Sequence, residues 1–139
     1  MNIDSIQNGV VIDHITAGSA MKLYSLLDLV ALDVPVAMIM NAQSSKTGKK
    51  DIIKIDAEIK LNLDVIGYVD PGATINIIKN GALTGKYTAK LPERLKNVLK
   101  CKNPRCISSC EQELPHVFKL TDKEKRVYRC IYCETATQQ

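Results

Sequence analysis

One stretch of this 139-residue chain, residues 101–133, begins with C-K-N-P-R-C and ends with C-I-Y-C. All five cysteines lie in this stretch, and 23 residues separate Cys106 from Cys130. Two close-spaced cysteine pairs on either side of an intervening segment are typical of a zinc site with four thiolate ligands. Asn103-Pro104 supplies turn chemistry within the first pair. We therefore predict one structural ion, Zn²⁺, per chain, bound by Cys101, Cys106, Cys130 and Cys133.

Other uses of these cysteines agree less well with the pattern. Disulfides are disfavoured in a cytosolic chain, and C-I-Y-C does not begin a helix in a βαβ unit, as a thioredoxin-like redox motif does. Four thiolates fill the metal's coordination shell, so we expect no catalytic zinc. Cys110 is interpreted as a thiol outside the site, with replacement of Cys106 as a ligand as the alternative. His116 stands alone and is interpreted as a surface or packing residue.

Composition changes along the chain. Residues 1–99 contain 11 basic and 10 acidic side chains and no cysteine, whereas residues 100–139 contain 8 basic and 5 acidic side chains. A segment of the latter size, with Phe118 as its one phenylalanine, buries too little apolar surface to fold alone, and a bound metal ion supplies the missing stability. We predict two domains, residues 1–92 and residues 93–139.

The overall composition excludes several classes of protein. Hydrophobic residues make up 45% of the chain and charged residues 24%, which indicates a globular protein. No apolar run reaches the length of about 18 residues that a membrane span requires. The first residues lack the pattern of a secretory signal, so we expect a cytoplasmic protein. Aromatic residues make up only 4%, so few rings are available to stack on single-stranded nucleic acid.

In the first domain, β-rich runs alternate with helical patterns. We expect strands at residues 9–15, 36–42, 50–56, 73–79 and 82–87, and helices at residues 19–31 and 61–69. Ser19 is the expected N-cap of the first helix, residues 43–49 form a polar loop, and Asn80-Gly81 is a strong hairpin turn. The order β-α-β-β-α-β with one added strand predicts an α+β protein. It has a ferredoxin-like antiparallel sheet with two helices, followed by a small zinc-ribbon-like β domain.

The residues alone predict a binding module rather than an enzyme. The chain contains neither a P-loop nor the glycine pattern of a dinucleotide-binding turn. Asp13 and His14 are neighbours in an expected strand, where adjacent side chains point to opposite faces, so they do not form an acid–base pair. No nucleophile and base can be assembled from the remaining residues.

Five strings in order carry a resemblance to a known family. They are G-V-V-I-D-H-I at residues 9–15, G-K-K-D-I-I-K-I at 48–55, A-T-I-N at 73–76, L-P-E-R-L at 91–95, and C-x4-C-I-S with C-x2-C. Together they resemble the regulatory chain of aspartate carbamoyltransferase over nearly the whole sequence. The resemblance implies a non-catalytic subunit of pyrimidine biosynthesis. Its first domain binds CTP as inhibitor and ATP as activator, its zinc domain docks on the catalytic chain, and regulatory dimers bridge two catalytic trimers.

The resemblance also assigns an effector site. It implies that Ile3 and Asp4 lie by the base and phosphate ends of the nucleotide. Asp13 accepts a hydrogen bond from the ribose, and His14 approaches the phosphates. Lys54 contacts the base or sugar side, and Lys86 contacts the triphosphate. The rest of the site is lined by Ile12, Lys50, Ile52, Asn76, Ile78 and Leu83. The contact with the catalytic chain involves Asn103, Arg105 and Glu134.

Four residues depart from the family pattern. Thr16 replaces a proline, Gly81 a tyrosine near the effector and Arg105 an asparagine, and Cys110 is an additional cysteine. The preferred nucleotide and the sign of the response therefore stay open. Two alternative functions also stay open, a nucleic-acid-binding zinc-ribbon protein and a metabolite sensor that acts with another partner.

Overall fold

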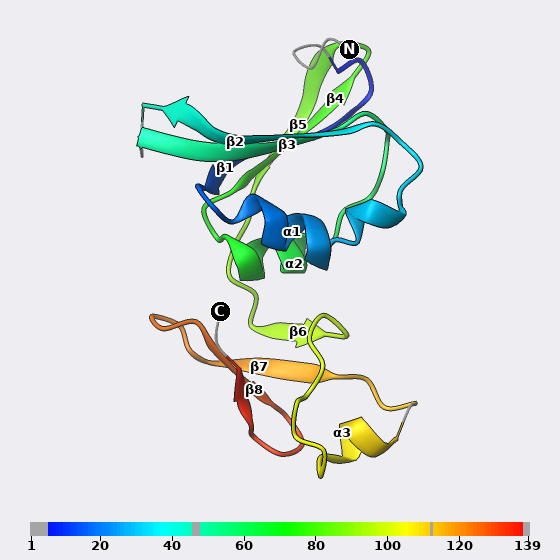
Figure 1. The fold of residues 1–139 in the computed structure, drawn as a ribbon, viewed down its shortest axis with the longest axis vertical. Helices are drawn as coiled ribbons and strands as arrows, with labels where there is room; N and C mark the ends of the chain where they lie inside the picture. Colours follow the sequence, from blue (N-terminus) through cyan, green and yellow to red (C-terminus); the bar gives the residue numbers. More distant parts are fainter. Residues whose placement is uncertain (1–5, 46–47, 112, 138–139) are drawn as a thin grey trace. The chain divides into compact units, whose positions relative to one another are not determined.

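The chain forms two compact units, Met1–Lys90 and Leu91–Gln139. The structure is a computed structural model that describes residues 6–45, 48–111 and 113–137. The division falls two residues before the predicted domain boundary after residue 92. Each unit contains its own sheet (Figure 1).

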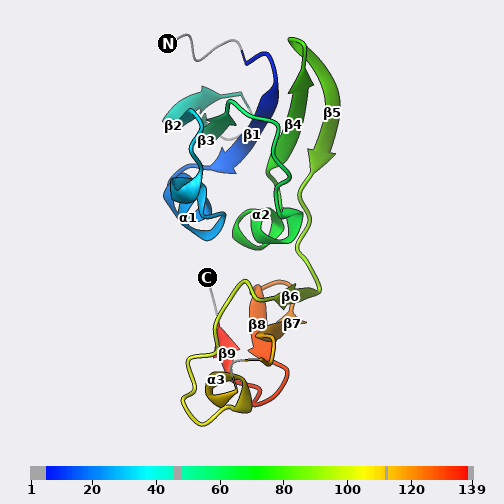
Figure 2. The same cartoon turned by 90° about the vertical axis from the view of Figure 1, so that its right-hand side faces the viewer.

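The first unit is a five-stranded antiparallel sheet with two α-helices on one face (Figures 1 and 2). The strands follow the order β2-β3-β1-β4-β5, and each neighbouring pair is antiparallel. This arrangement confirms the predicted α+β fold with a ferredoxin-like sheet. The elements are β1 (Gly9–Thr16), α1 (Ala20–Leu26), a 3-10 helix (Leu29–Ala31), β2 (Val36–Ser44), β3 (Gly48–Ile55), α2 (Leu63–Val69), β4 (Thr74–Lys79) and β5 (Ala82–Thr88).

Two segments differ from the expected elements. The helix expected at residues 19–31 is divided into α1 and the 3-10 helix, because Asp28 adopts a left-handed conformation with φ of 54°. Strands β2 and β3 extend through most of the loop expected at residues 43–49, because their ladder continues to the pair Ser44–Gly48. The spacing of apolar residues in a sequence does not reveal a single left-handed residue. It also does not reveal a strand ladder that polar residues form.

The core of the first unit lies between the sheet and the helices. Alternate residues of the central strands are buried, as the strand period of two requires. α1 contributes Ala20 and Leu23, and α2 contributes buried residues from Val65 to Val69. The buried strand residues are Val10, Ile12, Ile15, Ile53, Ile55 and Ile75. The intervening residues therefore lie on the opposite face of the sheet, which neither helix covers; we call it the open face.

Asp51 joins three elements of this unit. Its side chain is fully buried on β3, where its carboxylate accepts hydrogen bonds from the backbone N–H groups of Gly18, Ala20 and Asn41 at 2.9, 3.3 and 2.9 Å. Gly18 and Ala20 flank the start of α1. Ser19, the expected N-cap, makes no side-chain cap hydrogen bond there. The carboxylate of Asp51 thus satisfies N–H groups at this helix start and in the bulge of β2 at Asn41.

We expect Asp51→Ala to lower the free energy of unfolding by about 2 kcal/mol, because three backbone donors lose their acceptor. The measurement is urea unfolding of the metal-loaded chain, followed by far-UV circular dichroism. Asp56→Ala, at an exposed position just beyond β3, is the matched control and is expected to change stability by less than about 0.5 kcal/mol. Equal effects of the two substitutions would contradict the structural role of Asp51.

The second unit is a small antiparallel sheet with a short helix. Its strands β6 (Arg94–Lys96), β7 (Val117–Asp122), β8 (Val127–Cys130) and β9 (Ala136–Thr137) are neighbours in that order, and α3 spans Ile107–Cys110. Leu95, Phe118 and Tyr128 form its apolar centre, and the hydroxyl of Tyr128 donates to the carbonyl of Pro92 at 2.6 Å. In the part of the chain that the structure describes, no helix has the length and apolar character to cross a membrane.

Candidate functional site

Four cysteine side chains of the second unit converge. The Sγ atoms of Cys101, Cys106, Cys130 and Cys133 all lie within 4.8 Å of one another. Those of Cys101 and Cys133 are 3.5 Å apart and those of Cys106 and Cys130 are 3.6 Å apart, too far for a disulfide bond of about 2.05 Å. Thiolates around a tetrahedral zinc ion, with Zn–S bonds of about 2.3 Å, lie about 3.8 Å from each other. The cluster therefore fits one metal ion of this size and preference.

Tight turns bring each cysteine pair to the cluster. In the first turn, the Asn103 side chain accepts from the N–H of Arg105 at 3.0 Å, and the Asn103 carbonyl accepts from the N–H of Cys106 at 3.1 Å. In the second turn, the N–H of Glu134 donates to the carbonyl of Cys130 at 2.9 Å, and Glu134 has a φ of 64°. The two turns therefore place Asn103, Arg105 and Glu134 close in sequence to the cysteines of the cluster.

Two hydroxyl side chains that sequence reasoning missed contact the sulfur atoms. The Ser108 Oγ lies 3.0 Å from the Cys106 Sγ, and the Thr135 Oγ1 lies 3.1 Å from the Cys133 Sγ. Each hydroxyl follows the second cysteine of its pair by two residues, in C-I-S and C-E-T. This spacing, which is the same after both cysteine pairs, is the sequence signal that could have identified Ser108 and Thr135.

The pKa values of the thiols depend on these contacts. Burial raises the pKa of the Cys101 thiol to about 12, whereas hydrogen bonds with Thr135 lower the pKa of Cys133 to about 6. The Ser108 hydroxyl also lowers the pKa of Cys106. Because its raised pKa keeps Cys101 a neutral thiol at pH 7, a metal ion would have to displace this proton for Cys101 to serve as a thiolate ligand.

Cys110 and His116 lie outside the ligand set. Cys110 is exposed, and its Sγ is 3.7 Å from the carbonyl oxygen of Pro104. His116 accepts a hydrogen bond from the N–H of Cys101 at its Nδ1, at 3.4 Å. His116 therefore supports the backbone of a cysteine in the cluster, which the sequence pattern did not indicate.

On the open face of the first unit, three of the predicted effector residues form a row together with Val11. Val11 on β1 pairs with Lys54 on β3 and with Asn76 on β4, and Asn76 pairs with Lys86 on β5. Lys54, Val11, Asn76 and Lys86 therefore lie side by side across four strands. Because neighbouring strands are about 4.8 Å apart, the two lysines at the ends of this row are rooted about 14 Å apart. We call these residues the effector row, after the role that the sequence predicts for Lys54, Asn76 and Lys86.

A second group lies beside the effector row. The Lys50 Nζ is 3.0 Å from the Asp13 Oδ1, which also accepts from the N–H of His14 at 2.6 Å. The His14 Nδ1 is 3.0 Å from the Thr74 Oγ1, and His14 has a φ of 57° in a bulge of β1. Partial burial opposes ionisation of Asp13, but Lys50 and His14 outweigh it and lower the pKa of this carboxyl. Asp13 is therefore ionised at neutral pH and available as an acceptor.

The other predicted effector residues divide between the two faces. Ile78 pairs with Leu83 and with Gly9, whose neighbour Val10 is buried, and Ile52 lies between the buried Asp51 and Ile53. Ile52, Ile78 and Leu83 therefore lie on the open face. The Ile12 side chain is fully buried on the helix-covered face, between its partners Ile53 and Ile75. Strand alternation directs the Ile12 side chain into the core, so Ile12 reaches the open face only through its backbone. Ile3 and Asp4 lie outside the described residues.

Comparison with known proteins agrees with both units. The family described as "Aspartate carbamoyltransferase regulatory chain, allosteric domain" matches residues 1–90, and "Aspartate carbamoyltransferase regulatory chain, metal binding domain" matches residues 93–139. The chain belongs to the aspartate carbamoyltransferase regulatory chain family. Regulatory chains are not enzymes, which agrees with the absence of a catalytic motif in the sequence. The family assignment made from the five sequence strings is thus confirmed.

Individual relatives cover almost the whole chain. The regulatory chain of Clostridium botulinum is 49% identical over 134 residues, which are 96% of this chain and 92% of the relative. That of Clostridium tetani is 49% identical over 135 residues, 96% of this chain and 94% of the relative. That of Bifidobacterium longum is 40% identical over 134 residues, 96% of each chain.

Proposed function

We propose that this regulatory chain binds the nucleotide effectors CTP and ATP on its open face and thereby controls an aspartate carbamoyltransferase catalytic chain in pyrimidine biosynthesis. The observation that carries the proposal is the effector row, with Lys54 and Lys86 at its two ends. Lysines bind phosphate as point charges and need no P-loop. A span of about 14 Å between them suits an extended nucleoside triphosphate.

The neighbouring residues supply the other parts of such a site. Asp13 is ionised and offers an acceptor for the ribose hydroxyls, and His14 approaches the phosphates together with Lys86. Lys50 holds the Asp13 carboxylate at 3.0 Å and acts here as a positioning residue. Ile52, Ile78 and Leu83 provide apolar surface for the base. A few polar groups of this kind are enough to fix the orientation of a ligand.

The metal ion in this proposal is zinc, and its role is structural. The four cysteines close the coordination shell, so the ion supplies folding energy to the second unit and no chemistry. Three large apolar side chains near the cysteines remain exposed: Ile107 by 53%, Ile131 by 43% and Tyr132 by 37%. An apolar centre with polar residues around it is typical of a protein interface. We propose that this surface, with Asn103, Arg105 and Glu134, docks on the catalytic chain.

Control of the catalytic chain then follows from differential binding. An effector that prefers one quaternary state shifts the equilibrium, with a coupling free energy of typically about 1–3 kcal/mol. In the proposed assembly, residues 1–92 bind the effector and residues 93–139 hold the catalytic chain. Regulatory dimers connect catalytic chains in the cytoplasm.

Mixing the zinc-loaded chain with the catalytic chain from its own organism tests the proposal. We expect a larger complex in sedimentation velocity and an activity against aspartate that CTP or ATP shifts by about fivefold or more. Ile107→Lys is expected to weaken the complex without changing nucleotide binding, because Ile107 is exposed on the other unit. A larger complex with no nucleotide response would contradict the effector role, and no complex at all would contradict the whole proposal.

One feature of the second unit favours the alternative of nucleic-acid binding. Arg94, Lys119 and Arg129 are direct cross-strand partners on β6, β7 and β8, and all three are exposed. Like charges in direct opposition destabilise a sheet unless an anion neutralises them. This alternative predicts binding to duplex or single-stranded DNA that falls steeply with salt, with a slope of about one per phosphate contact. A failure to bind at low salt excludes it.

A further inference from the structure

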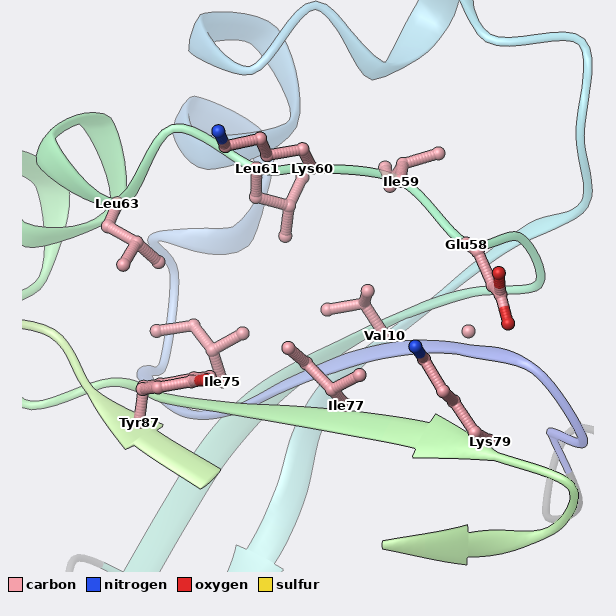
Figure 3. A pocket seen from close by; sticks show the side chains of 11 residues that line it. Val10, Glu58, Ile59, Lys60, Leu61, Leu63, Ile75, Ile77, Lys79 and Tyr87 are labelled. Atoms are coloured by element: carbon pink, nitrogen blue, oxygen red, sulfur yellow. The ribbon is translucent and has the colours of Figure 1, made fainter. Parts of the chain in front are cut away.

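A cavity of about 450 Å³ lies on the helix-covered side of the first unit, outside every residue assigned to the effector site. Its floor is formed by β1, β4 and β5, and its roof is the segment that leads from β3 into α2 (Figure 3). Its volume is within the range of small-molecule sites. The lining residues are Gly9, Val10, Glu58, Ile59, Lys60, Leu61, Leu63, Ile75, Ile77, Lys79 and Tyr87.

The body of the cavity is apolar. Val10 and Ile75 form buried parts of the floor, with Ile77 beside them and Leu61 opposite (Figure 3). At the far end, Leu63 and Tyr87 are exposed by 47% and 50%. Apolar side chains that border a cavity and remain half exposed favour occupation by an apolar group, because removing apolar surface from water is favourable.

The other end of the cavity carries one positive and one negative charge. The ammonium of Lys79 and the carboxylate of Glu58 both lie there, whereas the ammonium of Lys60 points away toward the start of α2 (Figure 3). Lys79 and Glu58 are exposed and are not joined by an ion pair within 4.0 Å in the described part of the chain. Two opposite charges that do not pair with each other are complementary to a ligand that carries both charges on neighbouring atoms.

We propose that this cavity binds a free α-amino acid with a large apolar side chain. Its carboxylate pairs with Lys79, its ammonium pairs with Glu58, and its side chain lies along Val10, Ile75 and Ile77 toward the ring of Tyr87. A simple carboxylate meets repulsion from Glu58, and a simple amine meets repulsion from Lys79, so the charges at this end select a zwitterion. The inference rests on the cavity alone and does not depend on the nucleotide proposal.

L-Tryptophan is a suitable probe, because the chain contains no tryptophan and the indole fluorescence therefore reports the ligand alone. We expect its fluorescence anisotropy to rise on titration with the metal-loaded full chain, with a Kd of about 0.1–1 mM for a ligand of this size. Indole-3-propionate lacks the ammonium and tryptamine lacks the carboxylate, and both are expected to bind at least about threefold more weakly. Equal binding of the three ligands, or no binding of L-tryptophan, would overturn the proposal.

Three substitutions that each remove one charge locate the ligand. Lys79→Gln is expected to weaken the binding of both L-tryptophan and indole-3-propionate by about threefold to tenfold. Glu58→Gln is expected to weaken L-tryptophan binding but to strengthen that of indole-3-propionate, because it removes the charge that repels a simple carboxylate. Lys60→Gln removes the same charge from the same cavity and is the control, with a change of less than about twofold. All three positions are exposed, so the variants are expected to fold. If Lys60→Gln weakened L-tryptophan as much as Lys79→Gln, the assigned carboxylate contact would be wrong.

Discussion

Replacing Cys130 with serine will release the metal ion and unfold the second unit. Cys130 is buried at the end of β8, and its Sγ lies in the four-cysteine cluster. Structural zinc contributes about 10–16 kcal/mol to the folding of small domains, so loss of one of four ligands is expected to lower metal affinity at least about hundredfold. The remaining core of Leu95, Phe118 and Tyr128 is too small to hold this unit together.

Cys110→Ser is the matched control for this experiment. Cys110 is exposed and lies outside the cluster, so this variant is expected to keep one ion per chain and normal stability. Metal content by mass spectrometry and hydrogen exchange of β7 and β8 give the two readouts. An unchanged metal affinity of Cys130→Ser in competition with a chelator would show that Cys130 is not a ligand. Loss of the ion in Cys110→Ser would assign a metal role to the additional cysteine.

The cysteine cluster could be predicted from the sequence because the spacing between nearby cysteines identifies its members. Two short spacings and the turn at Asn103-Pro104 are enough to select four cysteines out of five. The strand order was accessible for a similar reason, because each strand and helix has its own periodicity and few topologies accommodate the order β-α-β-β-α-β.

Other features depend on contacts between distant parts of the chain. Asp51 looked like one member of an alternating strand, yet its role comes from N–H groups 10 to 33 residues away. The burial of Ile12 follows from which face α1 and α2 cover. The amino-acid cavity exists because Leu61 and Leu63 lie opposite Ile75 and Ile77. A sequence records these residues but not their distances, so only the structure brings them together.

Replacing both Lys54 and Lys86 with alanine will weaken ATP and CTP binding by about hundredfold, with about tenfold for each single substitution. Hydrogen bonds to charged groups contribute about 1.5–3 kcal/mol, and the two lysines lie at opposite ends of the effector row, so their effects are expected to add. Both nucleotides are affected because they share the triphosphate, which attracts the ammonium of Lys86, and the sugar, on whose side Lys54 is expected to lie. Isothermal titration calorimetry at one fixed salt concentration is the measurement.

The control must separate contact from general attraction between a basic chain and an anion. Replacing Lys60 and Lys79 with alanine removes the same charge from the opposite side of the same sheet, so long-range attraction falls equally in both double variants. A loss of nucleotide affinity confined to the Lys54 and Lys86 variant shows direct contact, whereas equal losses would mean that the open face is not the site. Adenosine and cytidine add a further test. They lack phosphates, so their weaker binding should be almost unchanged by Lys86→Ala, and a tenfold loss for the nucleosides would contradict the assignment of Lys86 to the triphosphate.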